Sequence, residues 1–208
     1  MVYLPPVFTE TRPEILLAHI ERHDFAVLVS HGSRGLAASR VPFLLERRAE
    51  NLFLQAHLAR PNPQVADLAE AEEVLVLFEG PHAYISPRWY ATGPAVPTWN
   101  YADVHAYGRP QLIEDKEWLL AFLRRLSDRH ELGAAAPWRI EDQPASYISG
   151  MLNGVVGFEI RVNRLEGKFK LSQNRPASDR PRIIAALDAS GDPTAAAVAA
   201  LMRAREPG

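Results

Sequence analysis

The stretch GPHAYISPRWYATGPAVPTWNYADVHAYG, residues 80–108, decides how the rest of the chain is interpreted. It contains two of the four tryptophans and four of the six tyrosines of the sequence. Its four prolines fix the backbone φ angle at separate points and exclude a continuous helix. We expect these rings on extended segments and ordered turns, where they either bind a flat, conjugated ligand or fill the interior of a β-barrel.

The segments around this stretch alternate short apolar runs with helical patterns. Thr11 and Glu14 have the spacing of a capping box, and Pro13 suits a first helical turn. The expected strands are 25–30, 36–45, 51–58, 73–79, 83–86, 102–113 and 155–165, and the expected helices are 12–22, 64–70, 115–131, 145–152, 178–187 and one that begins at 192 or 193. Many closely spaced strands with inserted helices predict an α+β fold, a mainly antiparallel β-barrel with surrounding helices.

One domain is expected over residues 1–175, including a helical insertion at 115–152, and residues 176–208 are expected to form a helical C-terminal extension packed on the barrel. The chain of 208 residues is long enough for one substantial core. It has no cysteine, which excludes disulfides and thiolate zinc sites. Neither a membrane-spanning run nor a secretion signal is recognisable, so we expect a cytoplasmic protein.

The charge of the chain bears on nucleic-acid binding. The formal net charge is −2, which argues against a broad electrostatic surface for DNA. Short basic clusters occur at Arg47–Arg48, at Arg124–Arg125 and at Arg180 with Arg182, each interrupted by acids. We expect these clusters to be solvated faces and not a DNA-binding patch.

The pieces GPHAYISPRWY and VPTWNYADVHAYG, with KLSQNR at residues 170–175, resemble signature segments of the PaiB family. The likeness runs from the Tyr3-Leu4-Pro5-Pro6 start to the last helix. Proteins of this family are described as FMN-binding negative transcriptional regulators of the flavin split-barrel type. The resemblance therefore implies a split-barrel flavoprotein that binds FMN, and a homodimer with the cofactor at the subunit interface.

Two consequences of the resemblance stay open. The family description implies a DNA partner, but the sequence shows neither a basic face nor a helix-turn-helix pattern. Flavin-dependent redox activity is compatible with an FMN protein. Whether the chain is an enzyme is undecided, because the isolated acids Glu79, Asp103 and Glu159 have no identifiable partner for acid–base catalysis.

For the FMN phosphate, the predicted residues are Arg40, His57 and Asn62, with Ser39 as a neutral donor. Arg40 is the sharpest choice, because a guanidinium can bind phosphate through two parallel hydrogen bonds; a salt bridge to a nearby glutamate is the alternative. The helix expected at 64–70 follows a strand and a turn, which predicts free backbone N–H groups beside His57, Arg60 and Asn62. An ordinary helix cap gives the same pattern.

Candidates for the flavin ring and the ribityl chain come from the two other motifs. KLSQNR is either a solvated turn or, in the split-barrel resemblance, a segment that approaches the cofactor of this subunit or its partner. The loop 91–95 is shorter than in the PaiB pattern and lacks a lysine. The candidate residues are Thr98, Trp99, Asn100, Tyr101, Lys170, Ser172, Gln173 and Arg175.

Haem b is the alternative cofactor. Piperazate synthases, described as haem-dependent enzymes that form a nitrogen–nitrogen bond in N-hydroxylated ornithine, also resemble PaiB proteins. Without cysteine, the axial ligand would be histidine, tyrosine or methionine, and His57 is the candidate; a hydrogen-bonded core histidine is the competing interpretation. No metal site is predicted, because His82 and His105 lack the spacing and the carboxylates of a zinc site.

Overall fold

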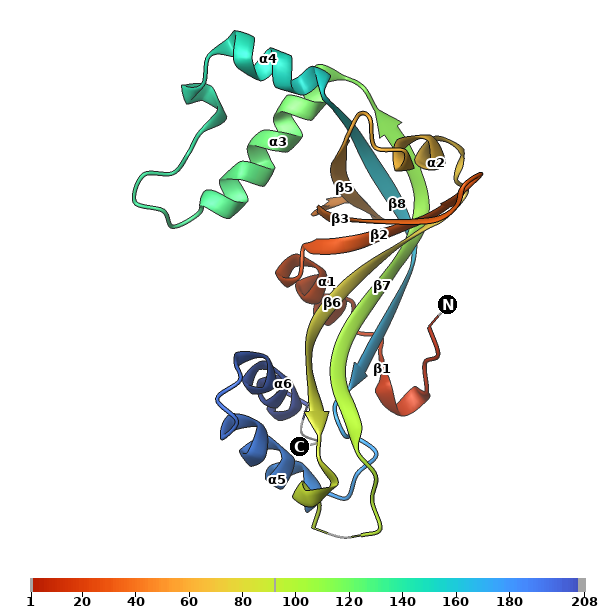
Figure 1. Cartoon of the computed structure of the whole chain (residues 1–208), viewed down its shortest axis with the longest axis vertical. Coiled ribbons are helices and arrows are strands. Elements are labelled where there is room, and N and C mark those ends of the chain that lie inside the picture. Colours follow the sequence, from red (N-terminus) through yellow and green to blue (C-terminus); the bar gives the residue numbers. More distant parts are fainter. Residues whose placement is uncertain (1, 92, 206–208) are drawn as a thin grey trace. The chain divides into compact units, whose positions relative to one another are not determined.

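The computed structural model describes residues 2–91 and 93–205 as an α+β fold, in which a mainly antiparallel sheet is combined with helices (Figure 1). The strands are β1 (Thr9–Glu10), β2 (Phe25–Gly32), β3 (Gly35–Pro42), β4 (Leu44–Arg48), β5 (Asn51–Ala59), β6 (Val74–Ile85), β7 (Thr98–Ile113) and β8 (Val155–Lys170). The α-helices are α1 (Pro13–Arg22), α2 (Gln64–Glu70), α3 (Lys116–Glu131), α4 (Ala145–Asn153), α5 (Asp179–Asp188) and α6 (Pro193–Arg203). Short 3-10 helices are η1 (Pro6–Phe8), η2 (Pro87–Trp89) and η3 (Ile140–Asp142).

The described residues form two compact units. Unit 1 lies within 1–23, 78–105 and 166–208, and unit 2 lies within 24–77 and 106–165. The long strands β6, β7 and β8 contribute residues to both units. The predicted domain boundary after residue 175 stays a prediction.

The sheet has the strand order β3-β2-β6-β7-β8-β5-β4, and β1 pairs with β8. In unit 2, β3 and β5 contact each other although they lie near opposite ends of this order. Phe43, which follows β3, meets Phe158 of β8 edge-on at 6.1 Å between ring centroids. The strands of unit 2 therefore curl toward a barrel that stays open, and among the described residues one edge of β3 has no strand partner.

Helix α3 packs on unit 2 through the apolar face that its helical period predicts. Phe122 and Leu126 form a core cluster with Leu44, and Trp118 and Leu123 pack against it. A Cβ atom on Gly157 of β8 would lie 2.5 Å from the Trp118 ring, so glycine at that position lets the helix approach the sheet closely.

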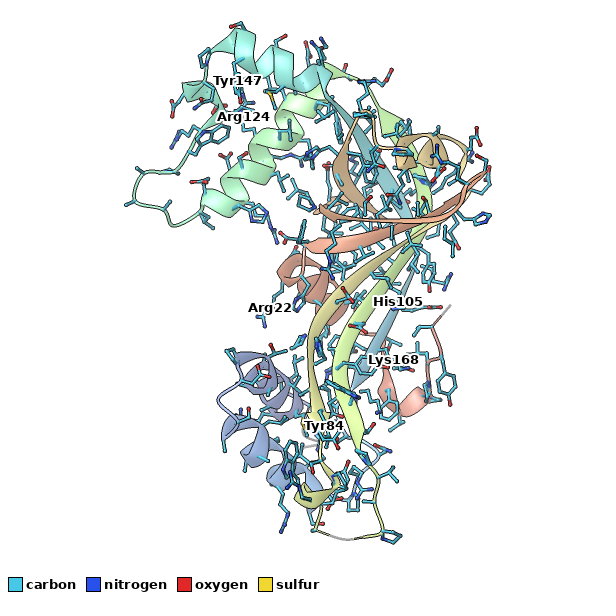
Figure 2. The ribbon with its side chains drawn as sticks, viewed as in Figure 1. Arg22, Tyr84, His105, Arg124, Tyr147 and Lys168 are labelled. Atoms are coloured by element: carbon cyan, nitrogen blue, oxygen red, sulfur yellow. The ribbon has the colours of Figure 1, made fainter. Side chains whose placement is uncertain are left out.

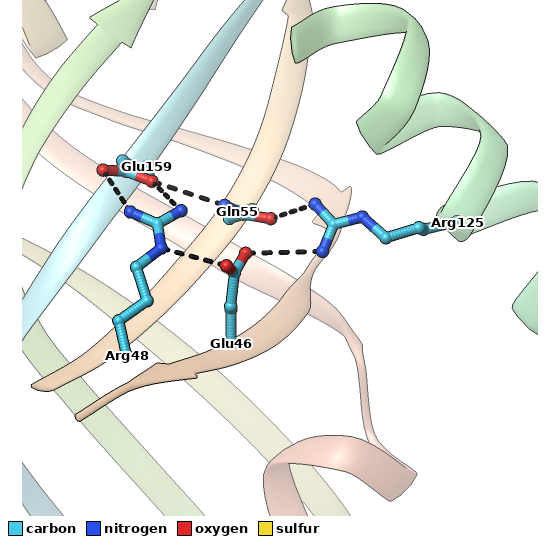
Figure 3. A network of polar contacts seen from close by, with 5 residues as sticks. All are labelled: Glu46, Arg48, Gln55, Arg125 and Glu159. Carbon is cyan, nitrogen blue, oxygen red and sulfur yellow. Dashed lines mark hydrogen bonds and ion pairs between the residues drawn. The ribbon is translucent and has the colours of Figure 1, made fainter. Parts of the chain in front are cut away.

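A polar network also ties α3 to the sheet (Figure 3). Arg48 binds Glu159 at 2.9 Å and Glu46 at 2.9 Å, and Arg125 of α3 donates to Gln55 at 2.6 Å and to Glu46 at 3.3 Å. The hydrogen bond from Arg48, with help from Arg125, lowers the pKa of Glu46 despite its partial burial. Arg48, Arg124 and Arg125 of the two basic clusters are therefore paired with acids, as expected for a solvated face.

Unit 1 contains α1, α5 and α6, and α5 and α6 lie side by side (Figure 1). Asp192 caps α6 by accepting from the Thr194 N–H at 2.8 Å, as its sequence predicts. Arg180, expected on a solvated face, is instead buried. Its guanidinium donates to the carbonyl oxygens of Leu171 and Met202 at 2.8 and 3.0 Å, so it joins α5 to the chain before it and to α6.

The predicted helices are confirmed within one or two residues, and the strand predictions need three corrections. Residues 73–79 and 83–86 belong to one strand, β6, which continues through Gly80. Glycine at this position lets β7 approach closely, because a Cβ there would lie 2.5 Å from Ala102 O. The strand expected at 36–45 is broken where the Phe43 N–H donates to Asp24 O at 2.8 Å. Strands β7 and β8 are longer than expected.

The predicted capping box at the start of α1 is wrong. The N-cap residue is Arg12, and no side chain caps the helix. The Arg12 N–H and guanidinium bind Glu10 at 2.9 and 2.8 Å, which fixes the chain before Pro13. No helix in the described ranges is both long and apolar enough to cross a membrane.

Candidate functional site

A polar pocket lies in unit 2 where β3 and β5 approach each other. Its volume is about 460 Å³. It contains the four residues that the sequence predicts for a phosphate. Its walls are Ser39, Arg40, Val41 and Pro42 of β3, His57, Leu58 and Ala59 of β5, Asn62 and Val155.

The cation of this pocket is Arg40. Its side chain is exposed, and its guanidinium lies 3.4 Å from Phe25 O, at the long end of hydrogen bonding. Arg40 lies opposite Val27 in the pairing of β2 with β3, so its backbone position is held by the hairpin. A terminal strand also presents backbone N–H and C=O groups at its outer edge, which adds ligand-binding groups beside Arg40.

Asn62 connects the pocket to the start of α2. Its carboxamide oxygen accepts from the Gln64 N–H at 2.9 Å, and its amide nitrogen lies 3.4 Å from Ser39 Oγ. The next two helical N–H groups, of Val65 and Ala66, donate to Asn62 O and Pro63 O. The prediction of free N–H groups at this helix start is therefore wrong, and binding in the pocket depends on side chains and on the β3 edge.

His57 supplies the clearest sign that the pocket receives a polar ligand. Its Nδ1 atom is buried and has no hydrogen-bond partner within the described residues. The ring meets Phe122 edge-on at 5.8 Å, and burial lowers the pKa of His57, which favours the neutral imidazole. A buried polar atom without a partner is costly, so a ligand that bonds to Nδ1 would be favoured.

A buried network supports the pocket from below. Gln64 is almost fully buried, and its Nε2 lies 3.0 Å from Ser30 Oγ and 3.3 and 3.4 Å from Leu28 O and Ala37 O. Ser30 also donates to the buried Asp67 of α2 at 3.3 Å. This network fixes α2, and with it Asn62, against β2 and β3. Gln64 was not predicted as a site residue, although a glutamine one residue after Pro63 is a recognisable polar residue at a helix start.

A second polar pocket, of about 170 Å³, lies in unit 1 between the two remaining motifs, and we call it the lysine pocket. Lys170 Nζ donates to Trp99 O at 2.8 Å and to Thr98 Oγ1, and partial burial lowers the pKa of Lys170. Asn100 and Ser172 are buried and bond to each other, with 2.9 Å between Asn100 Nδ2 and Ser172 Oγ. The predicted residues at this pocket are Thr98, Asn100, Lys170, Ser172 and Arg175.

Arg175 has two partners beside the lysine pocket. Its guanidinium lies 3.9 Å from the centroid of the Tyr90 ring and 2.6 Å from Asp179. Burial opposes ionisation of Asp179, but hydrogen bonds from the Ala91 N–H and from Arg175 lower its pKa. Arg175 is therefore paired with an acid beside the lysine pocket.

Three predicted residues line neither pocket. Trp99 is exposed, with its ring 5.9 Å from Tyr84 and 6.0 Å from His82. Tyr101 has Lys168 Nζ 5.6 Å from its ring. Gln173 bonds to Leu171 N and Phe169 O and therefore closes the turn after β8.

Comparisons with known proteins agree with this architecture. A family model described as "Putative FMN-binding domain" matches residues 2–164. The protein of Bacillus subtilis (strain 168) named "Protease synthase and sporulation protein PAI 2" is 32% identical over 201 residues, which cover 97% of this chain and 96% of that protein.

Solved structures show the same fold at low sequence identity. Flavocytochrome Anf3 from Azotobacter vinelandii aligns with a TM-score of 0.57 and 13% identity over 78% of this chain and 69% of that one. The FAD and heme binding protein from Mycobacterium smegmatis aligns with a TM-score of 0.55 and 15% identity, over 78% and 73%.

The fold is that of flavin-binding split-barrel proteins, which confirms the expected fold class. The chain belongs to the PaiB family of FMN-binding-domain proteins. The cofactor that this family membership indicates is FMN. None of these comparisons supports haem-dependent synthesis of a nitrogen–nitrogen bond.

Proposed function

We propose that the protein binds FMN in the polar pocket of unit 2, with the FMN phosphate near Arg40, Ser39, Asn62 and His57. The observation that carries this assignment is the buried Nδ1 of His57, which has no hydrogen-bond partner within the described residues, in a pocket that also contains an arginine. A phosphate dianion supplies the negative charge and the acceptors that Arg40, Ser39 and the Asn62 amide would bind. The volume of about 460 Å³ lies within the range of cofactor pockets.

Bound FMN would supply electron and hydride transfer, and the residues of the chain would hold and shield it. His57 is favoured as the neutral imidazole, which has one N–H donor and one acceptor, so Nδ1 can serve either a phosphate oxygen or a flavin N–H. The open edge of β3 would add backbone groups for the ring. The lysine pocket, with Lys170 and Thr98, remains a proposed contact region for the ribityl chain and ring of a flavin held by this subunit or its partner.

We also propose a cytoplasmic homodimer that covers an aromatic face of unit 1. This face carries Trp99 and Tyr84, which are about half exposed and whose ring centroids lie 5.9 Å apart. Tyr3 is 82% exposed. Tyr84 and Lys168 are marked on their strands in Figure 2, and Lys168 Nζ lies 5.4 Å from the Tyr3 ring. Aromatic side chains with polar tips are favoured at protein interfaces. Sedimentation should give twice the 23.2 kDa chain mass, and Trp99→Glu should shift it to the monomer while Trp138→Glu does not.

A regulatory role would act through the flavin or a metabolite. Arg48, Arg124 and Arg125 are paired with acids, and Arg180 is buried. Because the net charge is also −2, direct binding to DNA has little support. Tight, salt-sensitive binding to a defined promoter in a gel-shift assay would contradict this part of the proposal.

FMN titration tests the cofactor assignment. Arg40→Ala should weaken FMN about 10- to 100-fold, since a hydrogen bond to a charged group contributes about 1.5–3 kcal/mol. Asn62→Ala should weaken it less. Arg47→Ala is the matched control, because Arg47 is an exposed arginine outside the pocket, and its affinity should equal that of the wild type. Unchanged affinity in both pocket variants would show that FMN does not bind in this pocket. Loss of a Soret band in His57→Ala would instead support haem.

A further inference from the structure

A third pocket, here called the helix pocket, lies in unit 1 between α1 and α6. Its volume is about 520 Å³, larger than either polar pocket. All its walls belong to unit 1, and most of their surface is apolar. The lining residues are Glu14, Ile15, Ala18, His19, Arg22, His23, Pro81, Phe169, Ala197, Ala200, Leu201 and Ala204.

The space exists because α6 has two different faces. Ala195, Val198 and Met202 are buried against the rest of unit 1. Ala197, Ala200 and Ala204 follow each other at helical spacing of three and four residues on another face, which lines the pocket. Methyl side chains at these positions leave room that larger residues would fill.

The opposite wall and the floor combine apolar and polar groups. Ile15, Ala18, His19 and Arg22 repeat at the spacing of one face of α1. His19 is buried, donates from Nε2 to Phe78 O at 3.0 Å, and meets the Phe169 ring edge-on at 5.3 Å. Burial lowers the pKa of His19 to about 4, so the imidazole is neutral near pH 7. The floor is therefore uncharged.

Charge is concentrated at the two ends of α1. Arg22 and His23 lie at the C-terminal end, and Arg22 can be followed there in Figure 2. Within residues 2–91 and 93–205, Arg22 forms no ion pair. Glu14 lies eight residues earlier, about 12 Å along the helix axis, which is too far to neutralise Arg22. The pocket thus has an apolar body and a cationic end.

We propose that the helix pocket binds an apolar carboxylic acid. Its chain or ring would lie over Phe169 and between the alanines of α6 and Ile15 of α1, and its carboxylate would pair with Arg22. An apolar pocket of this size with a few polar groups and a titratable residue of perturbed pKa is the usual form of a small-molecule site. Arginine binds a carboxylate through two parallel hydrogen bonds, which selects an acid over an alcohol of equal length. This inference does not depend on where FMN binds.

Isothermal titration with decanoate, on the protein saturated with FMN, is the direct test. We expect saturable binding of one decanoate per chain, and at least tenfold weaker binding of decanol, which has the same chain but no charge. FMN should not compete with decanoate. Equal affinity for decanol and decanoate, displacement by FMN, or no binding at all would overturn the proposal.

Two variants locate the site. Ala200→Phe should abolish decanoate binding by filling the pocket, while Ala196→Phe is the matched control, because Ala196 is exposed on the same helix outside the lining. Arg22→Gln should reduce the affinity for decanoate about tenfold and leave that for decanol unchanged. Thermal melting of each variant checks that it is folded. Full binding in Ala200→Phe, or an unchanged preference for decanoate in Arg22→Gln, would place the ligand elsewhere.

Discussion

The polar pocket of unit 2 and the helix pocket of unit 1 differ in what their walls do for the folded state. Arg40, Ser39 and Asn62 are exposed or half-buried, and their removal leaves little of the core uncovered. Phe169 and His19, in the helix pocket, are buried in the core of unit 1. The side chains of the polar pocket are therefore free to serve a ligand, whereas those that floor the helix pocket also hold the fold together.

The largest difference is expected for removal of a floor residue. Phe169→Ala should lower the free energy of unfolding by about 3–5 kcal/mol, because it deletes a fully buried ring and leaves a cavity. Ser39→Ala, at the half-buried wall of the polar pocket, should cost less than about 1 kcal/mol. Urea denaturation of both variants measures the contrast. Losses of similar size would mean that the polar pocket is also part of the core.

The second contrast concerns pH. Burial lowers the pKa of His19 from 6.5 to about 4, so the unfolded chain binds a proton between these values that the folded chain does not. Stability should therefore fall as pH decreases below 6.5, by about 2 kcal/mol between pH 7 and pH 5 from this group. His19→Gln keeps a donor for Phe78 O but does not titrate, so its stability should depend less on pH.

Urea midpoints at pH 7 and pH 5 give the measurement. His31→Gln is the control, because His31 is exposed on β2. The facing groups are Arg22 and His23, which also lower the pKa of His19. Parallel pH dependence of wild type and His19→Gln would show that folding does not shift the pKa of His19.

A third substitution tests the buried support of the polar pocket. Gln64→Met keeps the length of the side chain and removes the donor that Ser30 Oγ, Leu28 O and Ala37 O share. We expect a loss of about 1–3 kcal/mol in stability, since buried acceptors lose their partner. FMN affinity should fall as well, because Asn62 and Ser39 would lose their fixed position. A stability loss with unchanged FMN affinity would separate the network from the site.

The fold class and part of the candidate site could be predicted from the sequence. Ser39, Arg40, His57 and Asn62 were predicted as one group, and they line one pocket, because a hairpin, a strand and a turn are local patterns. Thr98 and Lys170, both candidates for the flavin ring and ribityl chain, line one pocket, since the start of β7 lies beside the end of β8 in the sheet. The split-barrel class followed from the motifs of residues 80–108 and 170–175.

Other features depend on packing that no local pattern encodes. The helix pocket combines α1, Pro81, Phe169 and α6, segments that are far apart in the sequence. The continuity of β6 through Gly80 was missed for the same reason, because a Cβ there would lie 2.5 Å from the His19 ring, a contact that the sequence does not reveal. The capping box at Thr11 failed because Glu10 binds Arg12 and fixes the chain before Pro13.

The smallest effect on stability is expected at His57. His57→Phe keeps a ring against Phe122 and removes the buried Nδ1 that has no partner, so the free energy of unfolding should stay the same or rise by up to about 1 kcal/mol. The same change should weaken FMN binding severalfold, because the ligand loses its proposed hydrogen bond to Nδ1. Urea denaturation without FMN and fluorescence titration with FMN measure the two effects separately. A destabilised variant with full FMN affinity would show that His57 serves the fold as Phe169 does, and the contrast between the two pockets would not hold.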